Sequence, residues 1–203
     1  MLRKAGWGVM TLLAVLVAAY AVANAVVPGV RGGFVQDLFA AKALRSFGHM
    51  AAGGVALAVG ALQFSTRLRV RRPVVHRRLG MTYVAMVVVG GVSALLLAPS
   101  STGGVTAHFG FGILAVLWVT SAVVALVRVR AGDYAGHREW MIRSYALCLA
   151  AVTLRVYLPV SAISGIPFPE AYPAISWLCW VPNLVVAEWF LVRSSIAPVD
   201  AAA

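Results

Sequence analysis

Residues 76–98 read HRRLGMTYVAMVVVGGVSALLLA, in which a histidine and two arginines precede an apolar run that begins at Leu79. About 20 consecutive apolar residues are what an α-helix needs to cross the hydrocarbon core of a bilayer. Basic residues at one end of such a run mark the cytoplasmic side of a membrane span. This stretch therefore predicts a transmembrane helix that starts at the cytoplasmic face.

The rest of the chain repeats this pattern. We predict six spans, at residues 7–27, 47–64, 79–98, 107–127, 140–162 and 174–192. The fold class is accordingly all-α, a polytopic six-helix bundle, with residues 1–203 as a single integral-membrane domain. The composition agrees, because 62% of the residues are hydrophobic and only 11% are charged, whereas soluble domains are nearer half apolar and a quarter charged.

The first run follows Arg3 and Lys4, as the apolar region of a signal peptide would. It is long for such a region, so we expect an uncleaved first span.

Basic residues occupy alternate connections between the spans. The loops after the second and fourth spans hold Arg67, Arg69, Arg71, Arg72, Arg77, Arg78, Arg128, Arg130 and Arg138. The opposite loops hold only Arg31, Lys42 and Arg45. The positive-inside rule therefore predicts a multi-pass protein of the cytoplasmic membrane with both termini in the cytoplasm. This distribution also accounts for the net charge of +11, which we attribute to topology and lipid headgroups rather than to nucleic-acid binding.

The four histidines of the chain fall one apiece at the starts of four successive spans. His49 and His108 are expected at the outer side, and His76 and His137 at the cytoplasmic side. Neutral imidazole is the common protein ligand of haem iron, and facing helices of a bundle can hold the macrocycle between them. The pattern predicts one or two haem b groups. The alternative is that these residues cap or snorkel at the interfaces, which suits the arginine-flanked inner pair best.

A glycine follows three of the histidines by four residues, at Gly53, Gly80 and Gly112. Because residues i and i+4 share a helix face, each glycine leaves room beside an imidazole for a macrocycle. Glycine is also common in membrane helices, where it permits close helix packing, and this alternative stays open.

Three charged residues lie within the apolar runs. Arg143 and Glu188 are at the cytoplasmic ends of the fifth and sixth spans and are expected to form an ion pair. Arg155 lies about three turns further along, with no acidic residue of the sixth span at its depth. Its expected partner is a haem propionate, a lipid phosphate, or backbone carbonyls freed by Pro182.

From the second to the sixth span the chain resembles a bacterial membrane family named domain of unknown function 2306. The resemblance rests on His49 with Gly53, on ALQF at 61–64, HRRLG at 76–80, HREWM at 137–141, RSYAL at 143–147, TLR at 153–155 and WVPNL at 180–184. It implies a small multispan membrane protein, and the family carries no established activity.

The placement of the histidines is similar to that of the cytochrome b-561 family, six-span dihaem proteins that pass electrons across membranes. This similarity implies one haem between His49 and His108 and another between His76 and His137. The inner histidines of this chain are shallower than that pattern requires, and the chain shows no ascorbate-binding signature.

Two functions follow from these observations. The first is a haem-binding transmembrane electron carrier, an oxidoreductase in that sense, with a quinol or a small anionic donor. The second is a haem-free multispan protein, a transporter or an interaction scaffold, in which Arg155, Arg143 and Glu188 are the important polar residues. We expect no discontinuous helix pair, which disfavours a transporter. No Ser/His/Asp or HExxH pattern indicates a hydrolase, and we assign no catalytic residue.

Overall fold

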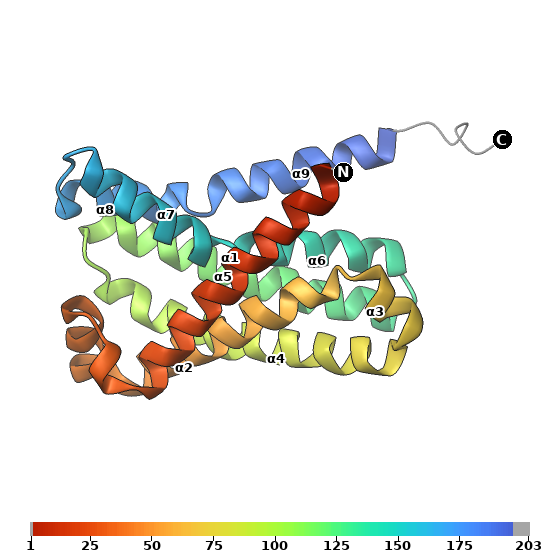
Figure 1. The fold of residues 1–203 in the computed structure, drawn as a ribbon, viewed down its shortest axis with the longest axis horizontal. Helices are drawn as coiled ribbons and strands as arrows, with labels where there is room; N and C mark the ends of the chain where they lie inside the picture. Colours follow the sequence, from red (N-terminus) through yellow and green to blue (C-terminus); the bar gives the residue numbers. More distant parts are fainter. Residues whose placement is uncertain (1, 197–203) are drawn as a thin grey trace.

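The computed structural model describes residues 2–196, and every regular element in this range is helical (Figure 1). In chain order the helices are α1 (Leu2–Val26), α2 (Gly33–Gln63), α3 (Thr66–Arg71), α4 (Pro73–Leu97), α5 (Gly104–Arg130), α6 (Tyr134–Cys148), α7 (Ala150–Ile163), α8 (Phe168–Leu178) and α9 (Val181–Ile196). Two short 3₁₀ helices, η1 (Pro28–Val30) and η2 (Ala98–Ser100), join α1 to α2 and α4 to α5. The predicted all-α fold class is confirmed for these residues.

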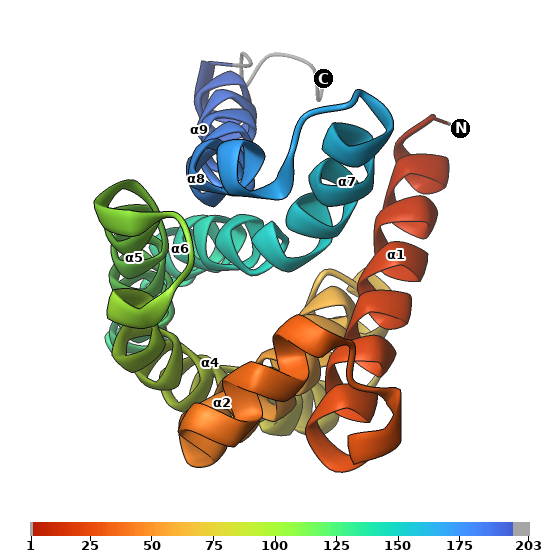
Figure 2. The ribbon, with the colours of Figure 1, turned by 90° about the vertical axis from the view of Figure 1, so that its left-hand side faces the viewer.

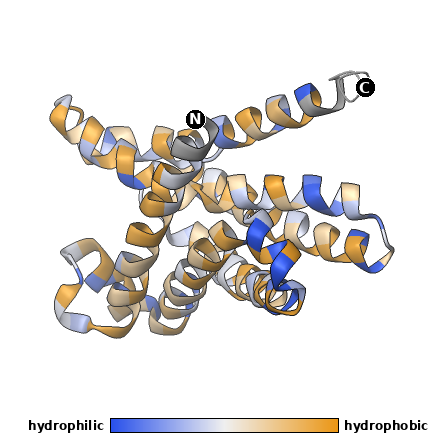
Figure 3. Cartoon of the chain, turned by 45° about the vertical axis from the view of Figure 1, so that its right-hand side comes forward, coloured by the Kyte–Doolittle hydropathy of each residue, from blue (hydrophilic) through white to orange (hydrophobic). Residues whose placement is uncertain are grey.

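Within the described range, five stretches are long and apolar enough to cross a membrane. They are Gly6–Val26, Pro73–Ser100, Gly104–Arg130, Tyr134–Ile163 and Phe168–Arg193. These correspond to the predicted first, third, fourth, fifth and sixth spans. Large apolar side chains such as Leu12, Leu16 and Val185 point outward from them, and Figure 3 shows apolar residues over the sides of the bundle. The chain is thus built as a multi-pass membrane protein.

The predicted second span, residues 47–64, lies in α2, which is not among these five stretches. The backbone of α2 leaves helical geometry at Lys42 (φ −148°, ψ 53°), so two helical segments meet at this kink and only the second contains the predicted span. His49 and Gln63 make that part less apolar than the other spans. The count of six spans and the cytoplasmic placement of the termini therefore stay predictions.

Two of the predicted spans, although each forms one continuous apolar stretch, are divided into two helices by a break of one or two residues. The fifth predicted span is interrupted at Leu149, between α6 and α7, and the sixth between α8 and α9 at Cys179 and Trp180. Pro182 explains the second interruption, because proline has no N–H to donate to the preceding turn. Residues around Leu149 include no proline or glycine that would have indicated the first.

Asn183 ties the two interruptions together. Its Nδ2 atom lies 3.3 Å from the Ala146 carbonyl of α6, 3.0 Å from the Thr153 hydroxyl of α7 and 3.0 Å from the Cys179 carbonyl that follows α8. Carbonyls at helix ends lack partners within their own helix. The side-chain amide of Asn183 therefore supplies donors where the helix breaks leave acceptors.

We predict that Asn183→Leu lowers the free energy of unfolding in detergent by about 1–2 kcal/mol, because hydrogen bonds between membrane helices average about 0.6 kcal/mol each. Asn24→Leu is the matched control, since the Asn24 amide bonds only to Tyr20 of its own helix. Chemical unfolding followed by tryptophan fluorescence measures both variants. Equal losses for the two would show that Asn183 does not link the helices.

Four helices form the unit that carries the histidines. Helix α4 packs against α2 and α5, α5 packs against α6, and α6 closes the ring against α2. Consequently α2 and α5 lie on one diagonal of the unit, and α4 and α6 on the other, as seen end-on in Figure 2. Around this unit, α1 packs on α2, α8 on α5 and α9 on α6.

The centre of the four-helix unit is filled by aromatic side chains whose polar atoms are bonded. The Tyr83 and Ser144 hydroxyls are 2.9 Å apart, and the Tyr145 hydroxyl donates to the Leu57 carbonyl at 3.1 Å. Both tyrosine rings pack on Gly60, where a Cβ atom would overlap them. This packed layer separates the two levels at which the histidines lie.

Candidate functional site

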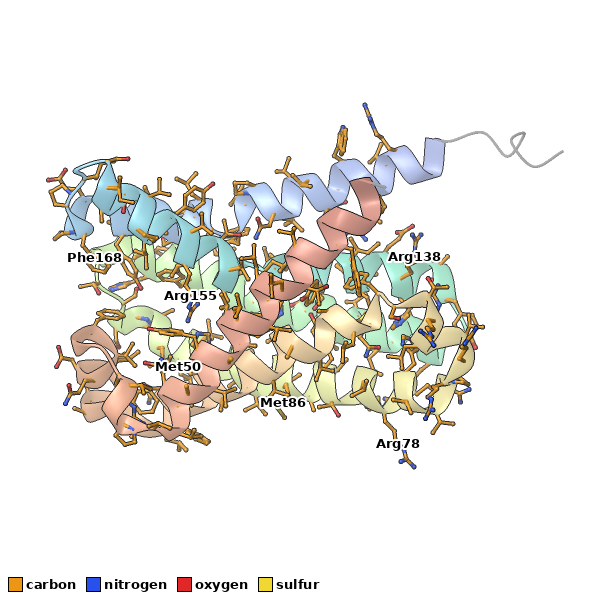
Figure 4. The ribbon with its side chains drawn as sticks, viewed as in Figure 1. Met50, Arg78, Met86, Arg138, Arg155 and Phe168 are labelled. Atoms are coloured by element: carbon orange, nitrogen blue, oxygen red, sulfur yellow. The ribbon has the colours of Figure 1, made fainter. Side chains whose placement is uncertain are left out.

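The members of each predicted histidine pair stand on diagonally opposite helices. His49 is on α2 and His108 on α5, whereas His76 is on α4 and His137 on α6. Figure 4 shows Arg78 and Arg138, neighbours of the inner pair, at one end of the bundle, and Phe168 at the other. The helix order is therefore compatible with a ligand held across either diagonal.

His49 is oriented by the backbone of α4. Its Nδ1 atom lies 3.2 Å from the Gly90 carbonyl. A carbonyl only accepts, so Nδ1 carries the proton and Nε2 is the nitrogen with a free lone pair. Helix α4 reaches this close because a Cβ atom on Gly90 would stand 3.2 Å from the Gly53 nitrogen. A backbone-bonded Nδ1 is the common support of a metal-binding imidazole.

His108 is turned toward the connection that precedes its own helix. Its Nε2 atom lies 3.1 Å from the Ser101 carbonyl. Gly103 and Gly104 make this return possible, since they adopt φ values of +100° and +65°, which favour glycine. The free nitrogen of His108 is therefore Nδ1. Ligation through Nε2 requires the ring to release Ser101.

The inner pair has one oriented and one unpartnered imidazole. The Nδ1 atom of His137 donates to the Ala125 carbonyl of α5 at 2.9 Å, which leaves its Nε2 free. The Nδ1 atom of His76 is buried and has no hydrogen-bond partner among the described residues. The two residues lie near the starts of α4 and α6, at the same, arginine-rich end of the four-helix unit.

Asp133 fixes the start of α6 and with it the position of His137. Its Oδ1 atom accepts from the Gly136 N–H at 2.8 Å and caps the helix, while Oδ2 accepts from Arg128 at 3.1 Å. These partners favour the charged form. The Gly136 N–H foremost, and Arg128 next, hold the pKa of Asp133 below its usual value.

A lowered carboxyl pKa stabilises the fold above the unfolded-state pKa, about 3.9, and this contribution is lost as the pH falls through the folded-state value. We predict that thermal unfolding temperatures of wild type and Asp133→Asn in detergent differ most at neutral pH and converge below about pH 4. Asparagine is the matched replacement, because it keeps the N-cap and removes only the charge. A difference that stays constant with pH would contradict the assignment.

The three glycines beside the histidines do not play one role. A Cβ atom on Gly53 would meet nothing within 4 Å, and one on Gly112 only the Ala98 side chain at 3.9 Å. A Cβ atom on Gly80 would stand 3.4 Å from Oε1 of Gln63. The positions one turn after both outer histidines are thus open, whereas the position at Gly80 is at ordinary van der Waals distance from Gln63 of α2.

The expected ion pair between Arg143 and Glu188 is present. Nε and one terminal nitrogen of Arg143 donate to the two carboxylate oxygens at 2.6 and 2.9 Å, a bidentate arrangement. The guanidinium also covers the Trp140 ring at 4.9 Å, and Glu139 lies 3.7 Å away. The pair joins α6 to α9 at the arginine-rich end.

Arg155, on α7, lies beside Tyr20 of α1. One terminal nitrogen donates to the Ala151 carbonyl at 2.8 Å, and the guanidinium stands 5.0 Å from the centre of the Tyr20 ring. Ala151 belongs to α7 itself, so the carbonyls freed by Pro182 are not its partners. The imidazole of His49 is within its electrostatic range. Figure 4 places Arg155 between α7 and the layer of α2 that carries Met50.

Tyr20 is the site residue that sequence reasoning missed. It comes from α1 and meets Arg155 across a contact between helices far apart in the chain. An aromatic residue toward the C-terminal end of the first span was the only available signal, and such residues are common near membrane interfaces.

Comparison with known proteins gives one match. A family described as "Predicted membrane protein (DUF2306)" matches residues 46–191. This range contains the four histidines, Arg155 and the Arg143–Glu188 pair, and it leaves α1 outside. No curated protein and no solved structure matches the chain.

Proposed function

Because the chain belongs to this DUF2306 family of membrane proteins, whose description names no activity, we propose a function from its own residues. The protein binds haem b between the outer histidines, His49 and His108, and carries electrons within the membrane. The inner pair is the place of a second haem. The single observation that carries the proposal is the placement of each pair on opposite helices of one four-helix unit.

The residues at the outer pair fit haem in three respects. The Gly90 carbonyl leaves Nε2 of His49 free, the positions beside Gly53 and Gly112 are open, and Arg155 supplies a positive charge nearby. His108 fits once its ring turns away from Ser101. At the inner level, His137 presents a free Nε2 and His76 an unpartnered nitrogen.

Bound haem would supply one-electron oxidation and reduction. His49 and His137, whose Nδ1 atoms bond to backbone carbonyls, would hold the group in a fixed orientation, and the tyrosine layer would keep water from passing between the two levels. A positive charge beside a redox centre favours its reduced state and raises its potential. The basic cluster of α3 and the start of α4 would attract a quinol headgroup or a small anionic donor.

Absorption spectroscopy of the purified protein tests the proposal. Cells supplied with a haem precursor should yield protein with a b-type spectrum and about one haem or more per chain. A folded, monodisperse and colourless protein that takes up no added haem would overturn it.

One observation favours a second candidate, a haem-free carrier of an anionic solute. Two spans are interrupted, at Leu149 and at Cys179 with Trp180, and substrate sites of transporters form at such discontinuous helices. A colourless protein that exchanges a labelled anion across vesicles would support this candidate instead.

A further inference from the structure

The described residues provide hydrogen-bond partners for only part of the Arg155 guanidinium. A guanidinium has five N–H donors. One bond to Ala151 is present, and the Tyr20 ring covers one face, but Nε is buried and has no partner among the described residues. Charges inside a membrane are costly unless they are paired, and they usually mark functional sites.

No carboxylate in the described part of the chain neutralises this charge. The ion pairs found there join Arg143 to Glu188 and Glu139, and Arg128 to Asp133. Arg155 differs in this respect from Arg143, whose charge is balanced by Glu188. A neutralising group must therefore come from outside those residues.

Arg31 shows that an arginine of the outer half can be satisfied by the protein alone. Its Nε donates to the Asn24 carbonyl at 2.8 Å, a terminal nitrogen donates to the Ala25 carbonyl at 3.0 Å, and the group lies 3.7 Å over the Phe39 ring. Both arginines thus have a carbonyl and a ring, and only Arg155 keeps an unpartnered Nε. The contrast points to a missing ligand rather than to a general feature of outer arginines.

The surroundings of Arg155 suit a ligand with an apolar part. The residue lies eight positions before the end of α7 at Ile163, about 12 Å along the helix at 1.5 Å per residue. One turn away, a groove of about 440 Å³ opens between α1, α7 and α9, and its walls include Met10, Leu13 and Val152. The guanidinium is therefore deep in the bundle and next to an apolar surface.

We propose that Arg155, with Tyr20 beside it, binds the oxyanion of a membrane-soluble ligand, a carboxylate or a phosphate. Arginine pairs with such groups through two parallel hydrogen bonds, and the unpartnered Nε is one of the donors of that fork. Two sources have this chemistry, the propionate of a haem and the headgroup of an acidic lipid. The inference does not require haem to be bound.

The experiment compares each acid with its ester, because esterification removes the charge and little else. Purified, delipidated full-length protein is titrated with haem, haem dimethyl ester, oleate, methyl oleate and phosphatidylglycerol. For wild type, we expect the true ligand to bind about 10- to 100-fold more tightly than its ester, the range of a charge-assisted fork. Arg155→Gln should abolish this preference, and Arg31→Gln should keep it.

The outcomes separate the sources. A preference for haem over its ester identifies the propionate, and a preference for oleate, or Arg155-dependent binding of phosphatidylglycerol, identifies a lipid. Lipid binding by a colourless protein would uphold this inference while the proposed haem function fails. If Arg155→Gln does not fold, thermal protection of wild type by the acids but not by the esters decides the matter. Equal affinities for acids and esters in wild type would overturn the proposal.

Discussion

We expect that replacing His49 by Gln removes the haem that we propose for the His49–His108 pair. Glutamine keeps a donor for the Gly90 carbonyl, which His49 now contacts at 3.2 Å, but it offers iron no imidazole nitrogen. Since even changes behind a metal ligand reduce affinity about 10- to 100-fold, loss of the ligand itself should lower haem content about tenfold or more. The measurement is the b-type absorbance per chain, with His108→Ala expected to behave alike.

His76→Ala provides the matched control, because it removes an imidazole at the other level of the same unit. It should leave the outer haem and its spectrum in place, and at most reduce the haem content to about half if both pairs bind. Folding of every variant is checked by its elution volume in detergent. A folded His49→Gln protein with wild-type absorbance would exclude His49 as a ligand.

Glu188→Gln is the second change from which we expect a large effect. It leaves Arg143, one fifth exposed, without the bidentate partner at 2.6 and 2.9 Å. Removing one member of a buried pair strands the other charge. Glu188 is 43% exposed, so we expect less than a fully buried pair would give, about 1–3 kcal/mol of unfolding free energy.

A double-mutant cycle separates the interaction energy between Arg143 and Glu188 from the cost of losing either side chain alone. Arg143→Met with Glu188→Gln should cost less than the two single changes added together, because neither charge is then stranded. Arg128, paired with Asp133 at the exposed end of α5, offers the control pair, whose coupling should be about 0–1 kcal/mol. Additive effects of Arg143 and Glu188 would show that the contact contributes nothing to stability.

The sequence predicted the helices well where hydropathy alone decides them. The run at 107–127 lies inside α5, and the run at 79–98 lies in α4 except for its last residue, Ala98, which begins η2. Twenty apolar residues have few other ways to satisfy their backbone in lipid. The break just before Pro182 could also be predicted, because proline has no N–H to donate to the preceding turn. The break at Leu149 could not, since no local residue demands it and the partner that accommodates it, Asn183, is distant in the sequence.

The candidate site was predictable in its positions and less so in its orientations. Arg143 and Glu188 could be paired because both lie near the same ends of the fifth and sixth predicted spans, at similar depth in the membrane. The direction of the His108 ring instead depends on two glycines of positive φ, and the ring beside Arg155 comes from α1. Contacts of this kind are set by how whole helices pack, and residue spacing within one helix carries no information about them.

The side chain of Asn183 also has a mechanical consequence. A break in a helix normally acts as a joint, yet here one amide spans the end of α6, the start of α7 and the end of α8. Bending at either break alone would stretch these shared hydrogen bonds. Asn183 therefore couples the two breaks and links α9 to α7, the helix that carries Arg155.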